Sequence, residues 1–476
     1  MMSRTQTLVP AAVPAMVLGG VAQFLVAFDA SVTNVALRAI RDDLHFSAAG
    51  LSWVVDAYAI AFGGLLLLGG RLTDRVGPRR MLLGGFILFA LASLAAYAVS
   101  EPWQLVAVRV LQGAAAAAVA PAAMASVAVV FTEPAERAKA FAAVAIGSAS
   151  GGAAGVVLSG VLTDALGWRT VVACGAVIAL AGAALAVRGA PGAARDAHGS
   201  TDWLGGVLAT GGLSILTYAL VTAPEHDGAR TAVPFVLAAG LLAAFVAVER
   251  RVPVPLVDLR IAATRSVAVP CLVMAVVVAG QFAAFYFVSL YLQIGLGYSA
   301  TRTGVAFLPF CAGIVASIAV ATKLLPKVGP RVVVVLGGVI ATVGFLLFAP
   351  LRADGGFLLS VLLPSLVTSF GIGMTFLPLP NVATAGLAPT DAGMVSGLVN
   401  TARQLGGALG LAALVAVSTS VSAEGAADVL PGYRVAIVCS AALIAVAVVL
   451  ALLLPRAMPS THPAPSGAVR ENEARA

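Results

Sequence analysis

Three charged residues stand inside long apolar runs, where they could carry a proton. A charge in the hydrocarbon of a membrane is costly, so Asp29, Asp56 and Arg109 each need an explanation. At the rise of a helix, Asp56 and Arg109 lie about 8 and about 10 Å from the same end of their runs. An arginine beside two carboxylates suits reversible protonation, because a paired acid stays ionised and a buried acid without a partner takes up a proton. The residue types therefore predict a proton-coupling site.

Each of these charges also has a plain structural explanation. Asp29 could serve only as the partner of Arg109, and Arg109 could be a clamp between helices. Asp56 could be solvated near the membrane interface. Arg403 is a fourth charge inside a run, which could line the interior or hold Asn400 and neighbouring carbonyls.

The composition requires that most of the chain be solvated by lipid. Hydrophobic residues make up 60% of the 476 residues and charged residues 10%, and the mean hydropathy is +1.02. Soluble domains carry about 25% charged residues. The composition therefore excludes a soluble enzyme, a disordered chain and a nucleic-acid binder. The net charge of +7 falls in short clusters between apolar runs, as expected for a membrane protein.

The apolar runs predict an all-α integral membrane protein with fourteen transmembrane helices. About 20 mostly apolar residues are needed for each crossing. The runs cover 13–37, 51–70, 81–100, 103–130, 141–163, 168–187, 203–221, 233–248, 267–291, 304–322, 332–350, 357–379, 395–418 and 435–454. Of the 28 Lys and Arg residues, 19 fall in one set of loops, 7 in the other and 2 within runs. This asymmetry predicts that both termini are cytoplasmic.

An internal repeat divides the chain into two halves. Val76–Arg79 (VGPR) recurs as Val328–Arg331, each time after the second run of a six-run block. Two six-helix halves are a transporter architecture. The predicted organisation is an N-terminal half, a central two-helix insertion, a C-terminal half and a cytoplasmic tail, at 1–190, 191–260, 261–456 and 457–476.

Four motifs carry a family resemblance. They are Asp29–Leu37 (DASVTNVAL), Gly70–Arg80 (GRLTDRVGPRR), Arg109–Gly113 (RVLQG) and Gly155–Gly160 (GVVLSG). Together they resemble the major facilitator superfamily, specifically its fourteen-span drug:proton antiporters. The last motif departs from the antiporter pattern G-P-x-x-G-G, because it lacks the proline and has Ser159 in place of a glycine. The resemblance implies that Asp29 and Arg109 handle protons and substrate.

The loop after the second run is interpreted as an inner gate. Its residues are Gly70, Asp74, Arg75, Gly77, Arg79 and Arg80. A carboxylate near helix ends and basic loops can latch such a gate. In the repeat, Pro326 takes the place of Asp74, so a strong latch is expected in the N-terminal half only. A solvated loop that merely sets the topology is the alternative.

Two further sets of residues are candidates for the transport path. The cavity or substrate candidates are Asn34, Gln112, Phe282, Phe285, Tyr286, Asn400 and Arg403, although the aromatic residues could equally face lipid. The helix-packing candidates recur at every fourth position: Gly147, Gly151, Gly155 and Ser159. Such a face lets another helix approach closely, either as a static contact or as an interface that slides.

These features predict proton-coupled efflux of hydrophobic or amphipathic small molecules, such as antibiotics, by alternating access in a bacterial plasma membrane. No HExxH, Walker A or GxSxG motif occurs, so we expect neither an enzyme nor a cofactor or metal. The expected partners are a small-molecule substrate, protons and membrane lipid, without nucleic acid, and the protein is expected to be monomeric. The alternatives are a transporter of another solute, a non-transporting membrane receptor and a membrane enzyme.

Overall fold

The structure is a computed structural model, which describes residues 9–131, 133–190, 202–223, 228–253, 255–350, 357–387, 389–422 and 429–456. Within these ranges the chain is helical and contains no strand. Helices suit lipid because each satisfies its own backbone hydrogen bonds. The α-helices are α1 (Val9–Leu44), α2 (Trp53–Val76), α3 (Pro78–Ala95), α4 (Pro102–Val130), α5 (Pro134–Leu166), α6 (Trp168–Ala173), α7 (Gly175–Gly189), α8 (Trp203–Thr222), α9 (Ala229–Glu249), α10 (Leu259–Ala262), α11 (Arg265–Leu290), α12 (Ala300–Ala306), α13 (Leu308–Phe348), α14 (Leu363–Phe376), α15 (Pro378–Thr384), α16 (Pro389–Val421) and α17 (Leu430–Ala451).

In the part of the chain that the structure describes, thirteen helical segments are long and apolar enough to cross a membrane. Twelve of the fourteen predicted runs each fall in one of them. The runs 304–322 and 332–350 both fall in the segment Ala300–Phe348. The all-helical membrane fold is therefore confirmed, whereas fourteen separate crossings stay a prediction.

The long helix α13 doubles back on itself. Gly329 has φ 78° and ψ 167°, a conformation that glycine adopts without strain, and it separates two helical arms. Contacts with α14 include Gly313–Ser369 and Ser317–Gly373 for the first arm, and Gly337–Gly371 and Gly344–Thr368 for the second. The order along α14 rises for the first arm and falls for the second. The two arms are thus antiparallel, which matches the two predicted runs.

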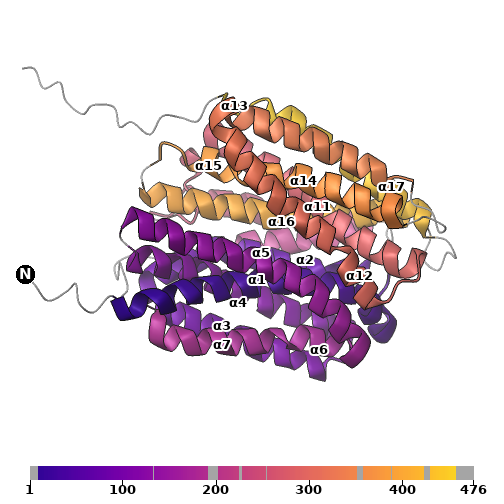
Figure 1. The fold of residues 1–476 in the computed structure, drawn as a ribbon, viewed down its shortest axis with the longest axis horizontal. Coiled ribbons are helices and arrows are strands. Elements are labelled where there is room, and N and C mark those ends of the chain that lie inside the picture. Colours follow the sequence, from indigo (N-terminus) through magenta and orange to yellow (C-terminus); the bar gives the residue numbers. More distant parts are fainter. Residues whose placement is uncertain are drawn as a thin grey trace, which may run out of the picture.

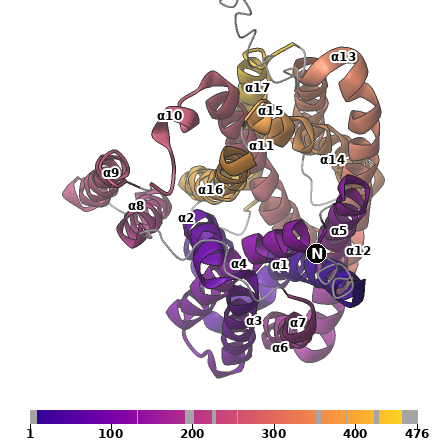
Figure 2. The same ribbon diagram turned by 90° about the vertical axis from the view of Figure 1, so that its left-hand side faces the viewer.

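The helices form two lobes with a helix pair at one side (Figures 1 and 2). In the N-terminal lobe, α1–α7, the closest neighbours are α1 with α5 and α2 with α4. In the C-terminal lobe, α11–α17, they are α13 with α14 and α11 with α16. The pair α8–α9 lies beside both lobes, because α8 packs on α2 of one lobe and on α16 of the other. The predicted tail, 457–476, lies outside the described residues.

The small-residue face of α5 packs directly against α1. A Cβ atom on Gly147, Gly151 or Gly155 would lie 2.2, 2.3 or 2.7 Å from a backbone oxygen of α1. The Ser159 hydroxyl donates a hydrogen bond to the carbonyl of Val32. The predicted close helix approach is therefore confirmed, and it joins two helices of the same lobe. A sliding interface at this contact stays a prediction.

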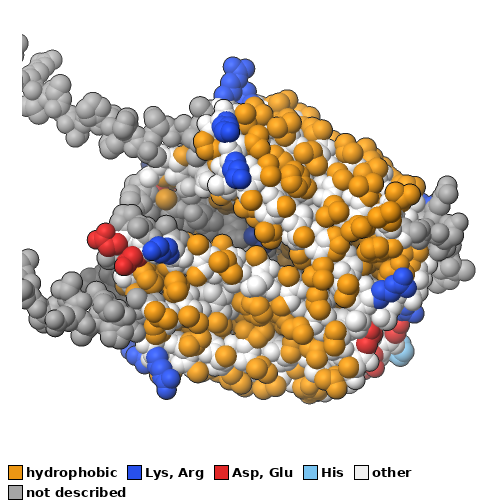
Figure 3. Space-filling view, viewed as in Figure 1, with side chains coloured by type: hydrophobic (Ala, Val, Ile, Leu, Met, Phe, Trp, Pro, Cys, Tyr) orange, Lys and Arg blue, Asp and Glu red, His pale blue; other side chains and the backbone are white. Residues whose placement is uncertain are grey.

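The molecule has two chemically distinct ends. At one end, here called the Gly77 end, the turn at Gly77 joins α2 to α3 and the turn at Gly329 joins the two arms of α13. At the other, the Trp168 end, lie α6 and α12. On the face shown in Figure 3, apolar side chains cover the middle and most charged side chains gather toward the ends. This distribution fits a protein surrounded by lipid between its ends.

Candidate functional site

Asp29 of α1 and Arg109 of α4 form a buried ion pair. Arg109 Nη1 lies 2.7 Å from Asp29 Oδ2, and both side chains are at most 2% exposed. The same nitrogen donates to Gln112 Oε1 at 2.8 Å, and Arg109 Nε donates to the Val54 carbonyl at 2.9 Å. The predicted pairing of Asp29 with Arg109 is confirmed. Such a pair persists in a low-dielectric interior only with good geometry and further hydrogen bonds, both of which are present here.

Two further side chains contact this pair or its hydrogen-bond partner Gln112. Gln112 Nε2 donates to Ser93 Oγ at 2.9 Å. The Arg109 guanidinium stacks over the Tyr58 ring at 4.6 Å from its centroid. Neither Ser93 nor Tyr58 was singled out from the sequence, because their contacts come from other helices. The network ties α1, α2, α3 and α4 to one pair of charges.

Asp56 does not flank Arg109 as the sequence suggested. It is fully buried, and neither of its carboxylate oxygens has a hydrogen-bond partner. The hydroxyl of Ser52, one turn earlier in the chain, donates instead to the Ala49 carbonyl. An ionised carboxylate in such a place is strongly disfavoured unless it is paired. Asp56 is therefore a buried acid without a partner, and it is not solvated at the interface.

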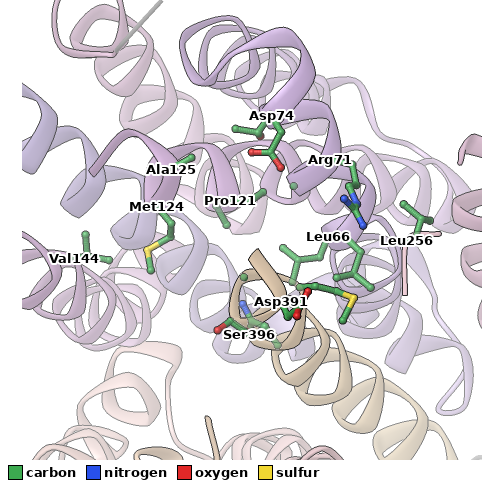
Figure 4. A pocket seen from close by; sticks show the side chains of 18 of the residues that line it. Leu66, Arg71, Asp74, Pro121, Met124, Ala125, Val144, Leu256, Asp391 and Ser396 are labelled. Carbon is green, nitrogen blue, oxygen red and sulfur yellow. The ribbon is translucent and has the colours of Figure 1, made fainter. Parts of the chain in front are cut away.

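A cavity of about 780 Å³ lies between the lobes toward the Gly77 end. Figure 4 shows side chains of α2, α4, α5 and α16 converging on it, with Asp74 and Arg71 on α2 and with Asp391 and Ser396 on α16. Figure 3 shows the molecule hollowed between its two lobes. The size falls within the range of small-molecule sites.

The cavity wall is mostly apolar, with polar groups on several sides. The apolar side chains include Leu66, Leu67, Met124, Phe141, Val144, Leu256 and Met394. Gln23, Ser148 and Asn400 add uncharged polar groups. Part of the rim comes from the segment between α9 and α10, where Arg71 Nη2 donates to the Pro255 carbonyl at 2.9 Å. This segment was not expected in the site, because nothing in its composition separates it from an ordinary loop.

The predicted gate residues divide between the cavity and the turn beside it. Gly70 and Asp74 line the cavity. Arg75 is in the last turn of α2, and Gly77 forms the turn with φ 95°. Arg79 and Arg80 begin α3. The signature therefore runs from the cavity wall to the turn at the Gly77 end.

At the Trp168 end the two lobes are joined by hydrogen bonds. Ser289 Oγ donates to the Asn34 carbonyl at 2.8 Å, and Gln293 Nε2 donates to the Val35 carbonyl at 3.1 Å. The guanidinium of Arg38 donates to the backbone carbonyl of Gln293. These contacts link α1 to α11 and to the turn after it.

A second contact between the lobes joins α5 to α12. Asp164 accepts from the backbone N–H groups of Ala300 and Thr301, at 3.2 and 2.8 Å. The backbones also approach closely, since a Cβ atom on Gly304 would lie 2.4 Å from the Val156 oxygen. The cavity is thus open toward the Gly77 end and closed at the Trp168 end.

Several predicted cavity residues lie elsewhere. Gln112 belongs to the buried network, and the carbonyl of Asn34 is held by Ser289. Phe285 packs between Phe307 and Phe310, with ring centroids 5.0 and 4.6 Å away. None of these lines the cavity of 780 Å³.

Two further aromatic candidates also pack within the protein. Tyr286 is 2% exposed, and its ring meets that of Phe287 edge-on. Phe282 lies against Gly407 of α16. Neither borders the cavity, whereas the predicted Asn400 does.

Comparison with known proteins identifies the family. The family model of the Major Facilitator Superfamily matches residues 19–411. The chain belongs to this superfamily. It is therefore a multi-pass membrane protein of a transporter family and not an enzyme, as the sequence motifs indicated.

Several relatives of the chain carry the names of antibiotics. The chain is 39% identical over 467 residues to the cephamycin export protein CmcT of Amycolatopsis lactamdurans, covering 97% of this chain and 95% of the relative. It is 40% identical over 448 residues to the puromycin resistance protein pur8 of Streptomyces alboniger, covering 91% and 89%. A lincomycin resistance protein of Streptomyces lincolnensis is 34% identical over 408 residues, covering 85% and 84%.

Solved structures of the superfamily share the fold. A bacterial homolog of the human lysosomal transporter Spinster, in an inward-facing and unoccupied conformation, matches with a TM-score of 0.64 and 15% identity, covering 94% of this chain and 97% of that one. The nucleoside transporter NupG matches with a TM-score of 0.66 and 12% identity, covering 93% and 99%. At these identities the likeness concerns the fold alone.

Proposed function

We propose that this superfamily member exports hydrophobic or amphipathic small molecules, antibiotics among them, in exchange for protons. The observation that carries this proposal is the mostly apolar cavity of about 780 Å³ between the lobes, which lies toward the Gly77 end while hydrogen bonds join the lobes at the Trp168 end. Names of relatives that include cephamycin export and puromycin resistance support the same substrate range. Alternating access would open the Trp168 end as the Gly77 end closes.

Proton coupling in this proposal rests on Asp29 and Asp56. Asp29 stays ionised while it is paired with Arg109 at 2.7 Å, and it takes up a proton when a change of conformation separates the two. Asp56 has no partner, so it is the second place where a proton is held. Protons that enter from outside would release the substrate there, and the return to the conformation open at the Gly77 end would release the protons into the cytoplasm and restore the ion pair. Asp74 and Arg75 at the cavity mouth would latch the Gly77 end.

The proposed orientation places the Gly77 end and both termini in the cytoplasm of a bacterial cell. The chain would then cross the membrane fourteen times, with the two arms of α13 as separate crossings. The clustering of Lys and Arg in one set of loops supports this orientation.

Reporter fusions test this topology. A phosphatase fused after Gly228, between α8 and α9, should be active, because that connection would be external. A phosphatase fused after Arg260 should be inactive, and a fluorescent protein there should fluoresce. An inactive phosphatase at Gly228 would remove the central pair from the count and leave twelve crossings.

The transport proposal is tested by drug susceptibility in a bacterial host that lacks its own efflux pumps. Expression of the full chain should raise the inhibitory concentration several-fold for at least one compound in a panel of puromycin, lincomycin and cefoxitin. A protonophore should restore accumulation of that compound, because the gradient that drives export is lost. The control is the same host carrying an empty vector. Unchanged susceptibility to the whole panel, with the protein present in the membrane, would contradict the proposal.

A further inference from the structure

The two arginines inside the predicted apolar runs, Arg109 and Arg403, differ in how their charge is balanced. Arg109 is paired with Asp29 at 2.7 Å, and it also donates to Gln112 at 2.8 Å and to the Val54 carbonyl at 2.9 Å. It is 1% exposed. Its charge is therefore balanced by Asp29 while the ion pair lasts.

Arg403 of α16 has none of these partners. Across the described residues it forms no ion pair and no hydrogen bond, and its one contact with a polar or aromatic group is the Phe376 ring, 5.6 Å from the guanidinium. A cation over an aromatic face gains about 1 kcal/mol, far less than a carboxylate would supply. The positive charge is therefore not compensated within the protein.

The Arg403 side chain faces the space between the lobes. It follows Ser396 and Asn400 at helical spacing, and both of these residues line the cavity. It is exposed, although it contacts α14 of its own lobe. Tyr58 of α2, in the other lobe, lies within electrostatic range of Arg403 and of Asp29. Arg403 thus presents an exposed guanidinium one helical turn beyond Asn400, although Arg403 itself is not among the residues that line the cavity.

Asp391, at the cavity mouth, is too far along α16 to balance this charge. Twelve residues separate it from Arg403, or about 18 Å along the axis. A water-filled mouth screens charges over about 8 Å. Asp29, whose charge acts on Tyr58 as that of Arg403 does, is paired with Arg109.

We propose that Arg403 anchors an oxyanion of the exported molecule, so that the preferred substrates are amphiphiles carrying a carboxylate or a similar acid group. The planar guanidinium forms two parallel hydrogen bonds with such a group, while the apolar cavity wall holds the rest of the molecule. This inference rests on the proposed export function and names its substrate class. An anionic lipid headgroup offers the same chemistry, and the experiment separates the two sources.

The test compares one dye in two forms. Rhodamine B has a free carboxylate, and its ethyl ester lacks this anion. Binding of both to the purified full chain in phosphatidylcholine nanodiscs is measured by fluorescence anisotropy. Arg403→Gln should weaken binding of the acid by about tenfold and change binding of the ester by less than about twofold. Arg403→Lys should recover part of the lost acid binding, because lysine keeps the positive charge but lacks the planar guanidinium that forms two parallel hydrogen bonds.

Unchanged binding of the ester also shows that the variant is folded. Arg302→Gln, at the Trp168 end, is the matched control, because its guanidinium stacks 3.7 Å from the Tyr298 ring and should leave both dyes unaffected. An equal loss for acid and ester in Arg403→Gln would make Arg403 a structural residue and overturn the inference. Unchanged binding of the acid, or a wild-type chain that does not bind the acid, would overturn it as well.

A second arm replaces part of the phosphatidylcholine with phosphatidylglycerol. Acid binding should persist. If phosphatidylglycerol abolishes binding of the acid, the lipid headgroup occupies Arg403 and the substrate assignment is overturned. The drug panel is independent of these results. If the chain confers resistance but shows no preference for acids, the proposed export function stands and only the substrate assignment is overturned.

Discussion

Asp29→Asn should abolish export against a concentration gradient while the protein still inserts and folds. Asn fills nearly the same volume and can accept the hydrogen bond from Arg109, but it cannot take up and release a proton. The remaining Arg109 charge would then have no counter-charge, and breaking one side of a buried pair typically costs about 3–5 kcal/mol. We therefore expect a lower melting temperature together with complete loss of coupling.

The measurement is substrate-induced proton release in proteoliposomes with an imposed pH gradient. Asp42→Asn is the matched control, because Asp42 is on the same helix in an exposed pair with Arg38 at 3.6 Å. That change should leave coupling intact, since exposed ion pairs contribute little. If Asp29→Asn still drives export under the pH gradient, another acid couples transport, and Asp56 is the next one to replace.

Gly304→Leu should prevent the lobes from closing at the Trp168 end and so reduce transport by at least about an order of magnitude. A Cβ atom at Gly304 would lie 2.4 Å from the Val156 oxygen, which is backbone and cannot move aside without shifting α5. The contact joins two lobes that are each packed on their own helices, so the chain should still insert. The conformations that are open at the Trp168 end would then dominate.

Labelling with a membrane-impermeant maleimide reports this shift. In a variant whose four cysteines are replaced by alanine, Ser289→Cys places the reporter where α11 contacts α1, and its labelling from outside should increase with Gly304→Leu. Gly240→Leu on α9 is the control, because nothing lies within 4 Å of its Cβ position. Equal labelling and normal transport in Gly304→Leu would show that this contact does not limit closure.

The position of nearly every helix could be predicted from the sequence, because lipid demands a continuous apolar run for each crossing. Helix ends could not, since helices continue beyond the apolar run where polar residues support them. The first run was predicted to end at residue 37, but α1 reaches Leu44, with Arg38 and Asp42 paired one turn apart. The turn at Gly329 occupies so few residues that two runs join in one helical segment.

The candidate site was predictable only in part. The positions of Asp29 and Arg109 within apolar runs predicted that they would pair, because opposite charges in hydrocarbon stabilise each other. The same argument placed Asp56 beside Arg109, and it failed because depth says nothing about which way a side chain faces. Hydrogen bonds to backbone oxygens, such as those of Arg109 to Val54 and of Arg71 to Pro255, could not be predicted, because every residue type has a backbone carbonyl.

The pair α8–α9 makes the two sides of the molecule unequal. Two seams run between the lobes, and α8 covers one of them by contacting both α2 and α16. The other seam is bordered by α5, whose residues Phe141, Val144 and Ser148 form part of the cavity wall. A hydrophobic compound dissolved in the surrounding leaflet would therefore find lateral entry blocked on one side and would reach the cavity past α5. In this geometry α8 and α9 cover one seam between the lobes, and a compound that enters from the bilayer would use the seam beside α5.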